Sequence, residues 1–176
     1  DVTERNNQEK ALRVLTTIFE ATPDYVVQMD RRGLITYANP AIRGLAGVAP
    51  GAPVEHLNFA GFSTEQTNAR FAEEILPAVN ERGAWLGETV ILDGQGREVA
   101  VNHLVIAHRN AEGQIERFSA VMRNISEEIA VRHEAERSAA AMRAVAELSP
   151  SILSVLDAEL RYRFVNTAFE QRVGRK

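Results

Sequence analysis

An internal repeat is the feature that most constrains the fold of this chain. Residues 23–47 align without a gap on residues 150–174. Eight further positions of the alignment are apolar in both copies. A repeat of this kind predicts tandem copies of one module, and modules in series are typical of signal relay rather than of catalysis. The identical positions are Pro23, Asp30, Asn39, Ala41 and Gly47, which correspond to Pro150, Asp157, Asn166, Ala168 and Gly174.

Composition excludes several kinds of partner and chemistry. The net charge of -4 provides no basic surface, so we expect no nucleic-acid binding. No apolar stretch reaches the length of a membrane span and no signal peptide is visible, so we expect a cytoplasmic location without direct membrane contact. The absence of cysteine excludes disulfides, thiolate nucleophiles and cysteine-based metal sites. The chain does not begin with Met, so we expect it to be a piece of a longer protein.

Hydrophobic periodicity predicts five strands. Residues 25–30 and 34–38 are short apolar runs on either side of a turn, and together they predict a hairpin. Residues 85–92, 99–107 and 115–123 are joined by two short glycine-containing turns. The last two of these runs alternate apolar with polar side chains, which predicts an antiparallel sheet with one buried face.

Four helices are expected around the strands. The first covers residues 3–21. Asn39 caps a short helix, which explains its recurrence as Asn166 better than a binding role does. A longer helix spans residues 64–81, and Pro77 should kink or restart it. The last helix covers residues 127–147 and has small side chains that bury little area, so we expect it to need a partner and to form a homodimer. Its weak coiled-coil seam comprises Ala135, Ala139, Met142 and Ala146.

The order of these elements resembles that of a PAS domain, and four local sequences agree with the resemblance. The stretch from Asp30 through Asn39-Pro40-Ala41 is similar to the opening of the fold. Gly83-Ala84-Trp85-Leu86-Gly87-Glu88 resembles the Gly-x-Trp-x-Gly-Glu segment of the third strand, and the Asp93-Gly94 turn follows it. Arg123-Asn124-Ile125-Ser126 resembles its ending. The resemblance implies an α+β fold, in which a five-stranded antiparallel sheet carries helices on one face and is flanked by N- and C-terminal helices.

The resemblance also implies a domain organisation and a function. Residues 1–22 are expected to be a linker helix after a preceding PAS domain, and residues 23–126 the PAS domain itself. Residues 127–149 would be a connecting signalling helix, and residues 150–176 the truncated start of a second PAS domain. Such a chain is expected to be a sensory and signal-relay module of a bacterial signal-transduction protein. It would bind a small ligand or partner and pass a conformational change through its flanking helices. An alternative is a ligand-free dimerisation and spacer module.

The expected partners are a second copy of the chain and the neighbouring PAS and output domains. The resemblance implies that the output is a sensor histidine kinase or a cyclic-di-GMP enzyme such as a diguanylate cyclase. We find no phosphate loop or nucleophile motif, so we expect this regulatory region to have no catalytic residues and no activity of its own.

The resemblance implies an internal cavity, and seven residues are candidates to line it. Packing in the core is the simpler interpretation of each, and Trp85 is expected to pack the sheet against the flanking helix. Asn102 is the polar candidate, and a polar group that faces a cavity requires a partner. A roomy cavity with polar groups would favour sensing, and a cavity filled by side chains would favour relay. The candidates are Met29, Tyr37, Phe71, Ile75, Trp85, Asn102 and Phe118.

Cofactor expectations follow from the residues that are present. Without cysteine, the cysteine-dependent flavin photochemistry of light-sensing PAS domains is excluded. A haem-binding PAS domain would place a His on the helix over residues 64–81, which has none, so we expect no haem and no metal. His103 and His108 are expected on the surface of the sheet. His133-Glu134 resembles the phospho-acceptor pair of histidine kinases without the rest of that motif, and is interpreted as a solvated helix face.

Overall fold

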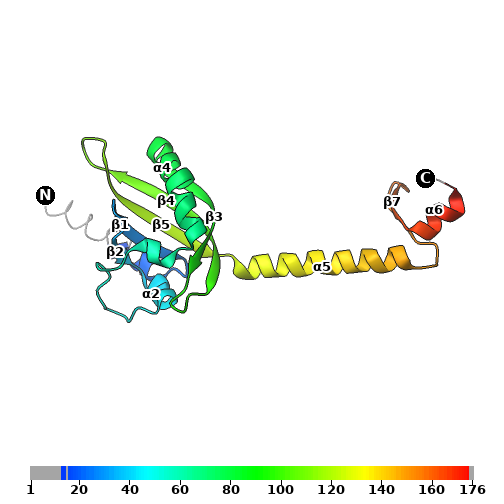
Figure 1. The fold of residues 1–176 in the computed structure, drawn as a ribbon, viewed down its shortest axis with the longest axis horizontal. Helices are drawn as coiled ribbons and strands as arrows, with labels where there is room; N and C mark the ends of the chain where they lie inside the picture. Colours follow the sequence, from blue (N-terminus) through cyan, green and yellow to red (C-terminus); the bar gives the residue numbers. More distant parts are fainter. Residues whose placement is uncertain (1–12, 15, 175–176) are drawn as a thin grey trace. The chain divides into compact units, whose positions relative to one another are not determined.

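The computed structural model describes residues 13–14 and 16–174 (Figure 1). They belong to two compact units, the first up to Ser126 and the second from Glu127. Residues 13–14 and 16–21 are helical, in agreement with the helix expected there. The earlier part of that helix lies outside the described residues.

A five-stranded antiparallel sheet forms the centre of the first unit, as the sequence predicted. Its strand order is β2-β1-β5-β4-β3, so the first hairpin lies at one edge and β3 at the other. Strand β1 pairs with β5 over its whole length, which joins the beginning and the end of the unit. The strands are β1 (Tyr25–Asp30), β2 (Ile35–Ala38), β3 (Ala84–Leu92), β4 (Glu98–Arg109) and β5 (Ile115–Asn124).

Short helices cover one face of this sheet and complete the core (Figure 1). Strand residues such as Val27, Val105 and Met122 pack there against Ile42 and Val79 of the helices, and all five side chains are buried. Burial of apolar surface on a single face is the main stabilising contribution to such a layer. The helical elements are α2 (Pro40–Ala46), the 3₁₀ helix η1 (Phe59–Phe62), α3 (Glu65–Arg70), η2 (Phe71–Ile75) and α4 (Leu76–Arg82).

The helix expected over residues 64–81 is continuous but irregular. Pro77 lies in the first turn of α4 and directly follows the helical segment η2, so it has no N–H to donate to the preceding turn. The preceding segment η2 is a π-helix, in which the N–H of Leu76 donates to the carbonyl of Phe71. This wider turn lets the chain pass the proline without stopping the helix, so the predicted kink takes the form of a π-bulge.

The second unit contains one long helix and the beginning of the repeated module. Its hairpin repeats that of the first unit, but Leu160 has φ of 60° where the aligned Gly33 has φ of 82°. That left-handed conformation is unfavourable for a branched side chain. Several apolar side chains of this two-stranded hairpin are exposed, including Val155, Leu160 and Tyr162. The elements are α5 (Ser126–Leu148), β6 (Ser154–Leu156), β7 (Tyr162–Val165) and α6 (Thr167–Val173).

Candidate functional site

A cavity of about 180 Å³ lies between the sheet and the helical layer of the first unit. Met29 of β1 and Phe118 of β5 come from the sheet, and Phe59 and Phe71 come from the helices. The rings of Phe71 and Phe118 meet edge to face with centroids 6.4 Å apart. The cavity also has polar lining residues, among them Asn58, Ser63, Thr67 and Asn68. The lining of the cavity therefore combines apolar and polar side chains.

Three of the seven predicted residues, Met29, Phe71 and Phe118, come together at this cavity. Ile75 is completely buried in the core and is not among the lining residues. Tyr37 lines a different groove, beside Glu20 and Pro40.

The prediction for Asn102 is wrong, because its side chain is exposed on β4. Successive residues of a strand point to opposite faces, and Val101, His103 and Val105 take the inward positions. His103 is fully buried, so the expectation that it lies on the surface is also wrong. The sequence contained the signal, since His103 is in phase with the two valines. Histidine is a polar residue and is therefore expected at the surface, which is why the burial of His103 was not predicted.

His103 occupies an apolar environment inside the first unit. Its ring centroid lies 6.1 Å from that of Phe59 and 6.2 Å from that of Trp85. Its Nδ1 is 3.0 Å from the hydroxyl of Thr89, while Nε2 has no hydrogen-bond partner among the described residues. Burial lowers the pKa of His103 from 6.5 to about 4, because the charged imidazolium would lose its hydration. The residue is therefore neutral at pH 7.

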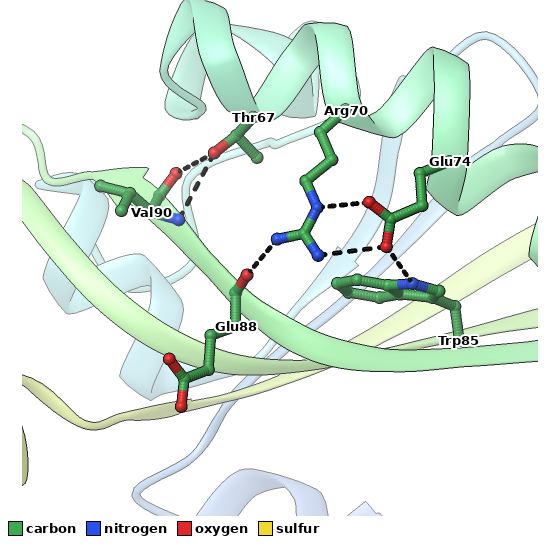
Figure 2. Close-up of polar contacts among 6 residues, drawn as sticks. All are labelled: Thr67, Arg70, Glu74, Trp85, Glu88 and Val90. Carbon is green, nitrogen blue, oxygen red and sulfur yellow. Dashed lines mark hydrogen bonds and ion pairs between the residues drawn. The ribbon is translucent and has the colours of Figure 1, made fainter.

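Trp85 joins β3 to the helical layer, as the sequence predicted (Figure 2). Its indole N–H donates to Glu74 Oε1 at 3.1 Å, and the guanidinium of Arg70 lies 5.2 Å from the ring centroid. Arg70 binds Glu74 through two N–H groups and donates a third bond to the carbonyl of Glu88. The hydrogen bonds from Arg70 and from Trp85 hold the pKa of the Glu74 carboxyl below its usual range.

The glycine two residues after Trp85 allows this arrangement. A Cβ added at Gly87 would lie 2.5 Å from Cζ2 of the Trp85 ring, which therefore lies directly over the glycine. Gly83 has φ of 82° and ends helix α4. The two glycines of the Gly-x-Trp-x-Gly-Glu pattern thus have separate structural roles. Gly83 caps helix α4, and Gly87 has no side chain where the Trp85 ring packs.

Asn39 connects the incoming helix to the first strand and to α2. Its side chain is completely buried. Oδ1 accepts hydrogen bonds from the N–H groups of Val26 and Ile42, at 3.0 and 3.1 Å. Nδ2 donates to the carbonyls of Phe19 and Asp24, at 3.0 and 2.9 Å. The predicted cap is therefore confirmed, and the same amide also holds the last turn of the helix that precedes the module.

Asn166 repeats this junction in the second unit. Its Oδ1 accepts from Leu153 and Phe169, and its Nδ2 donates to the carbonyl of Ala146 in the last turn of α5. Leu153 and Phe169 align with Val26 and Ile42 in the repeat, and Ala146 stands at the same offset from Phe19, just before the repeat begins. The amide also lies within hydrogen-bond distance of the carbonyls of Ser149 and Ser151. Both units thus attach their incoming helix in the same way.

A glutamate at the end of the incoming helix supports the junction in both units. In the first unit, Glu20 accepts a hydrogen bond of 2.8 Å from the hydroxyl of Tyr37. Partial burial and this hydrogen bond raise the pKa of Tyr37 to about 12, so the hydroxyl remains a donor at neutral pH. In the second unit, Glu147 accepts from the N–H and the hydroxyl of Thr167 instead. Thr167 aligns with a proline of the first copy, which has no N–H to donate.

Asp24 extends the junction of the first unit to its last strand. The carbonyl of Asp24 is held by Asn39, and its carboxylate accepts two hydrogen bonds from Arg123, at 3.0 and 3.1 Å. Arg123 lies close to the start of α5, where Ser126 forms a hydrogen bond with the Asn124 side chain. The points where the chain enters and leaves the module are therefore connected through a few residues.

Within the described residues, no cluster of three or more His, Asp or Glu side chains is arranged to bind a metal ion. In the same part of the chain, no helix is both long and apolar enough to cross a membrane.

Comparison with known proteins places this geometry in a family. A family model described as the PAS fold matches residues 15–125. Among solved structures, a PAS domain of a protein from Colwellia psychrerythraea superposes with a TM-score of 0.60 at 19% identity, over 66% of this chain and 98% of that chain. No curated protein matches the sequence.

Two further structures have the same fold at lower similarity. The PAS domain of a LuxR-family transcriptional regulator from Burkholderia thailandensis has a TM-score of 0.53 at 15% identity, over 63% of this chain and 96% of that chain. A PAS domain from a two-component sensor histidine kinase has a TM-score of 0.51 at 14% identity, over 66% and 98%.

Proposed function

The chain belongs to the PAS family, and from this premise we propose that it relays a conformational change between the helices that enter and leave its PAS domain. PAS sensory domains occur in histidine kinases and transcriptional regulators. The observation that carries the proposal is the junction built by Asn39, because the same junction recurs at Asn166.

The contacts of the first unit supply a short path for this relay. A movement of the incoming helix displaces the carbonyl of Phe19, and the hydrogen bond from Asn39 transmits this displacement to Asn39. Asn39 holds Asp24, and Asp24 holds Arg123 immediately before α5. The pairing of β1 with β5 carries the same displacement through backbone hydrogen bonds. A relay of this kind requires an element with two arrangements, and the helix junction is the element that both sides bias.

Replacing Asn39 with Asp tests the relay. Aspartate keeps the acceptor oxygen for Val26 and Ile42 but removes the donor that holds Phe19 and Asp24. We expect amide exchange at residues 130–132, whose N–H groups close the first turn of α5, to accelerate about tenfold. Amides of β3 serve as an internal reference, because a global loss of stability would accelerate them to the same extent.

Asn58→Asp is the matched control for this experiment. Asn58 also caps a short helix through Oδ1 and donates from Nδ2 to a carbonyl, but it lies in the loop before η1. We expect this variant to leave exchange at the start of α5 unchanged. Equal acceleration of β3 and α5 in Asn39→Asp, or no change at α5, would contradict the relay.

Dimerisation through α5 is the second proposed function. A chain that only dimerises in this way would be the ligand-free spacer module named above as the alternative. Val131, Met142, Val145 and Leu148 are exposed on this helix, at 65–85% of their maximal area. We expect Met142→Glu, in the seam, to lower the molar mass measured by sedimentation equilibrium toward that of a monomer. Ala140→Glu adds the same charge outside the seam and should not. A wild-type chain that stays monomeric at high concentration would exclude this function.

The output lies outside this chain in the proposal. We propose that the longer protein is a bacterial sensor histidine kinase or a cyclic-di-GMP enzyme, and that this region regulates it without activity of its own. Support comes from the tandem arrangement of the two copies.

A further inference from the structure

A second recess adjoins the cavity of the first unit and has a different electrostatic character. It has a volume of about 270 Å³, and Arg31, Leu76 and Phe118 line both spaces. The remaining residues of the recess are Asn80, Arg109 and Ile115, so two arginines and no acidic side chain line it. This is notable in a chain whose net charge is -4.

Neither of these two arginines forms an ion pair with a carboxylate of the described residues. Arg109 donates to the backbone carbonyls of Gly113 and Asn80, at 2.8 and 2.6 Å, which fixes its position and uses two of its donors. The guanidinium of Arg31 forms no hydrogen bond or ion pair with the described residues. Other arginines of this unit do have carboxylate partners, for example Arg97 with Asp93. The recess therefore presents two guanidinium groups with no carboxylate partner among the described residues, and that of Arg109 is held in place by its backbone hydrogen bonds.

The adjoining cavity provides an apolar wall on the other side of the shared residues. Met29, Phe59 and Phe71 line it beyond Phe118. Asp30 also lines this cavity, and its Oδ1 is occupied by the N–H groups of Arg32 and Leu34 in the turn. Arg31 and Arg32 line the cavity together with Asp30, whereas the recess has Arg31 and Arg109 and no acidic side chain, so the recess is the part of the site that favours an anionic group.

We propose that the cavity and the recess bind a small organic carboxylate, with its apolar body against Phe71 and Phe118 and its carboxylate at Arg31 and Arg109. Guanidinium groups bind carboxylates through paired N–H donors, and an apolar wall with a few polar groups is the usual composition of a ligand site. The cavity is smaller than a drug-sized site, so the ligand is compact. The inference goes beyond the proposed relay, because it gives the PAS domain a ligand and names the ligand class.

Titration of the chain with benzoate and hexanoate, followed by amide chemical shifts, tests this inference. The neutral controls are benzamide and hexanamide, which keep the shape and remove the charge. We expect a carboxylate to bind about tenfold more tightly than its amide, with shifts at Arg31 and Phe118. Arg31→Gln should remove this advantage and leave amide binding unchanged. The Arg31 side chain is exposed and forms no hydrogen bond or ion pair with the described residues, so we expect this variant to change recognition without changing stability.

Arg82→Gln is the control for a general loss of charge, because Arg82 lies exposed in α4. It should leave the affinity for carboxylates unchanged. Equal affinity for carboxylates and amides, an Arg31→Gln variant that binds like the wild type, or no binding of either carboxylate at millimolar concentration would each overturn the ligand class. None of these results affects the exchange experiment on Asn39, so the relay and the ligand class can fail separately.

Discussion

Replacing Asn39 with alanine is expected to lower the free energy of unfolding of the first unit by about 3 kcal/mol. Asn39 is fully buried and forms four hydrogen bonds, all with backbone groups. Alanine removes the helix cap and leaves the N–H groups of Val26 and Ile42 without their acceptor. A buried donor without a partner costs far more than the net value of the bond. Urea denaturation followed by circular dichroism measures the effect.

Asn58→Ala is the comparison for this prediction. Asn58 is an exposed cap, so water replaces its hydrogen bonds after substitution, and we expect a cost of about 1 kcal/mol. Similar losses of stability in the two variants would show that Asn39 acts only as a helix cap. They would contradict the proposal that its contacts with the incoming helix hold the junction together.

Acid is expected to destabilise the first unit through His103. The pKa of His103 is about 4 in the folded protein and near 6.5 in the unfolded chain. Above pH 6.5 neither state binds the proton and the contribution to stability is complete. As the pH falls from 6.5 through 4, the unfolded chain takes up the proton first and the contribution is lost. This difference corresponds to about 2–3 kcal/mol between pH 7.5 and pH 4.5.

His103→Gln isolates this contribution from other groups that titrate in acid. Glutamine has no proton to gain, so the variant should lose about 2–3 kcal/mol less than the wild type over the same pH interval. His108→Gln changes an exposed histidine that is hydrogen-bonded to Ser119, and should behave like the wild type. Parallel pH profiles for wild type and His103→Gln would show that burial of this histidine does not affect stability.

Local elements of the fold were predictable because their signals lie within a few residues. Asn39 followed by Pro40 predicted the start of α2, and the cap is present. Alternation along residues 99–107 predicted β4, and the order of five strands and the helices between them indicated the PAS fold. Each of these signals depends on backbone geometry and on the nearest neighbours in the chain.

The candidate site was predictable only in part. Met29, Phe71 and Phe118 were expected near a cavity because they are large apolar residues of the relevant elements, and they do line it. The unpaired state of Arg31 and the burial of His103 depend on contacts with segments far away in the sequence. Arg31 stands in a turn like many solvated arginines, so nothing in the local pattern distinguishes it.

The sequence by itself determined the repeat, the helix caps, the strand pattern and the absence of cysteine chemistry. Tertiary structure decided which face of β4 is buried, and hence that His103 points inward and Asn102 outward. It also decided that the amides of Asn39 and Asn166 reach back to the preceding helix, as well as capping the next one. The physical reason is that caps and alternation arise between neighbours along the chain, whereas burial and charge pairing arise between segments that folding brings together.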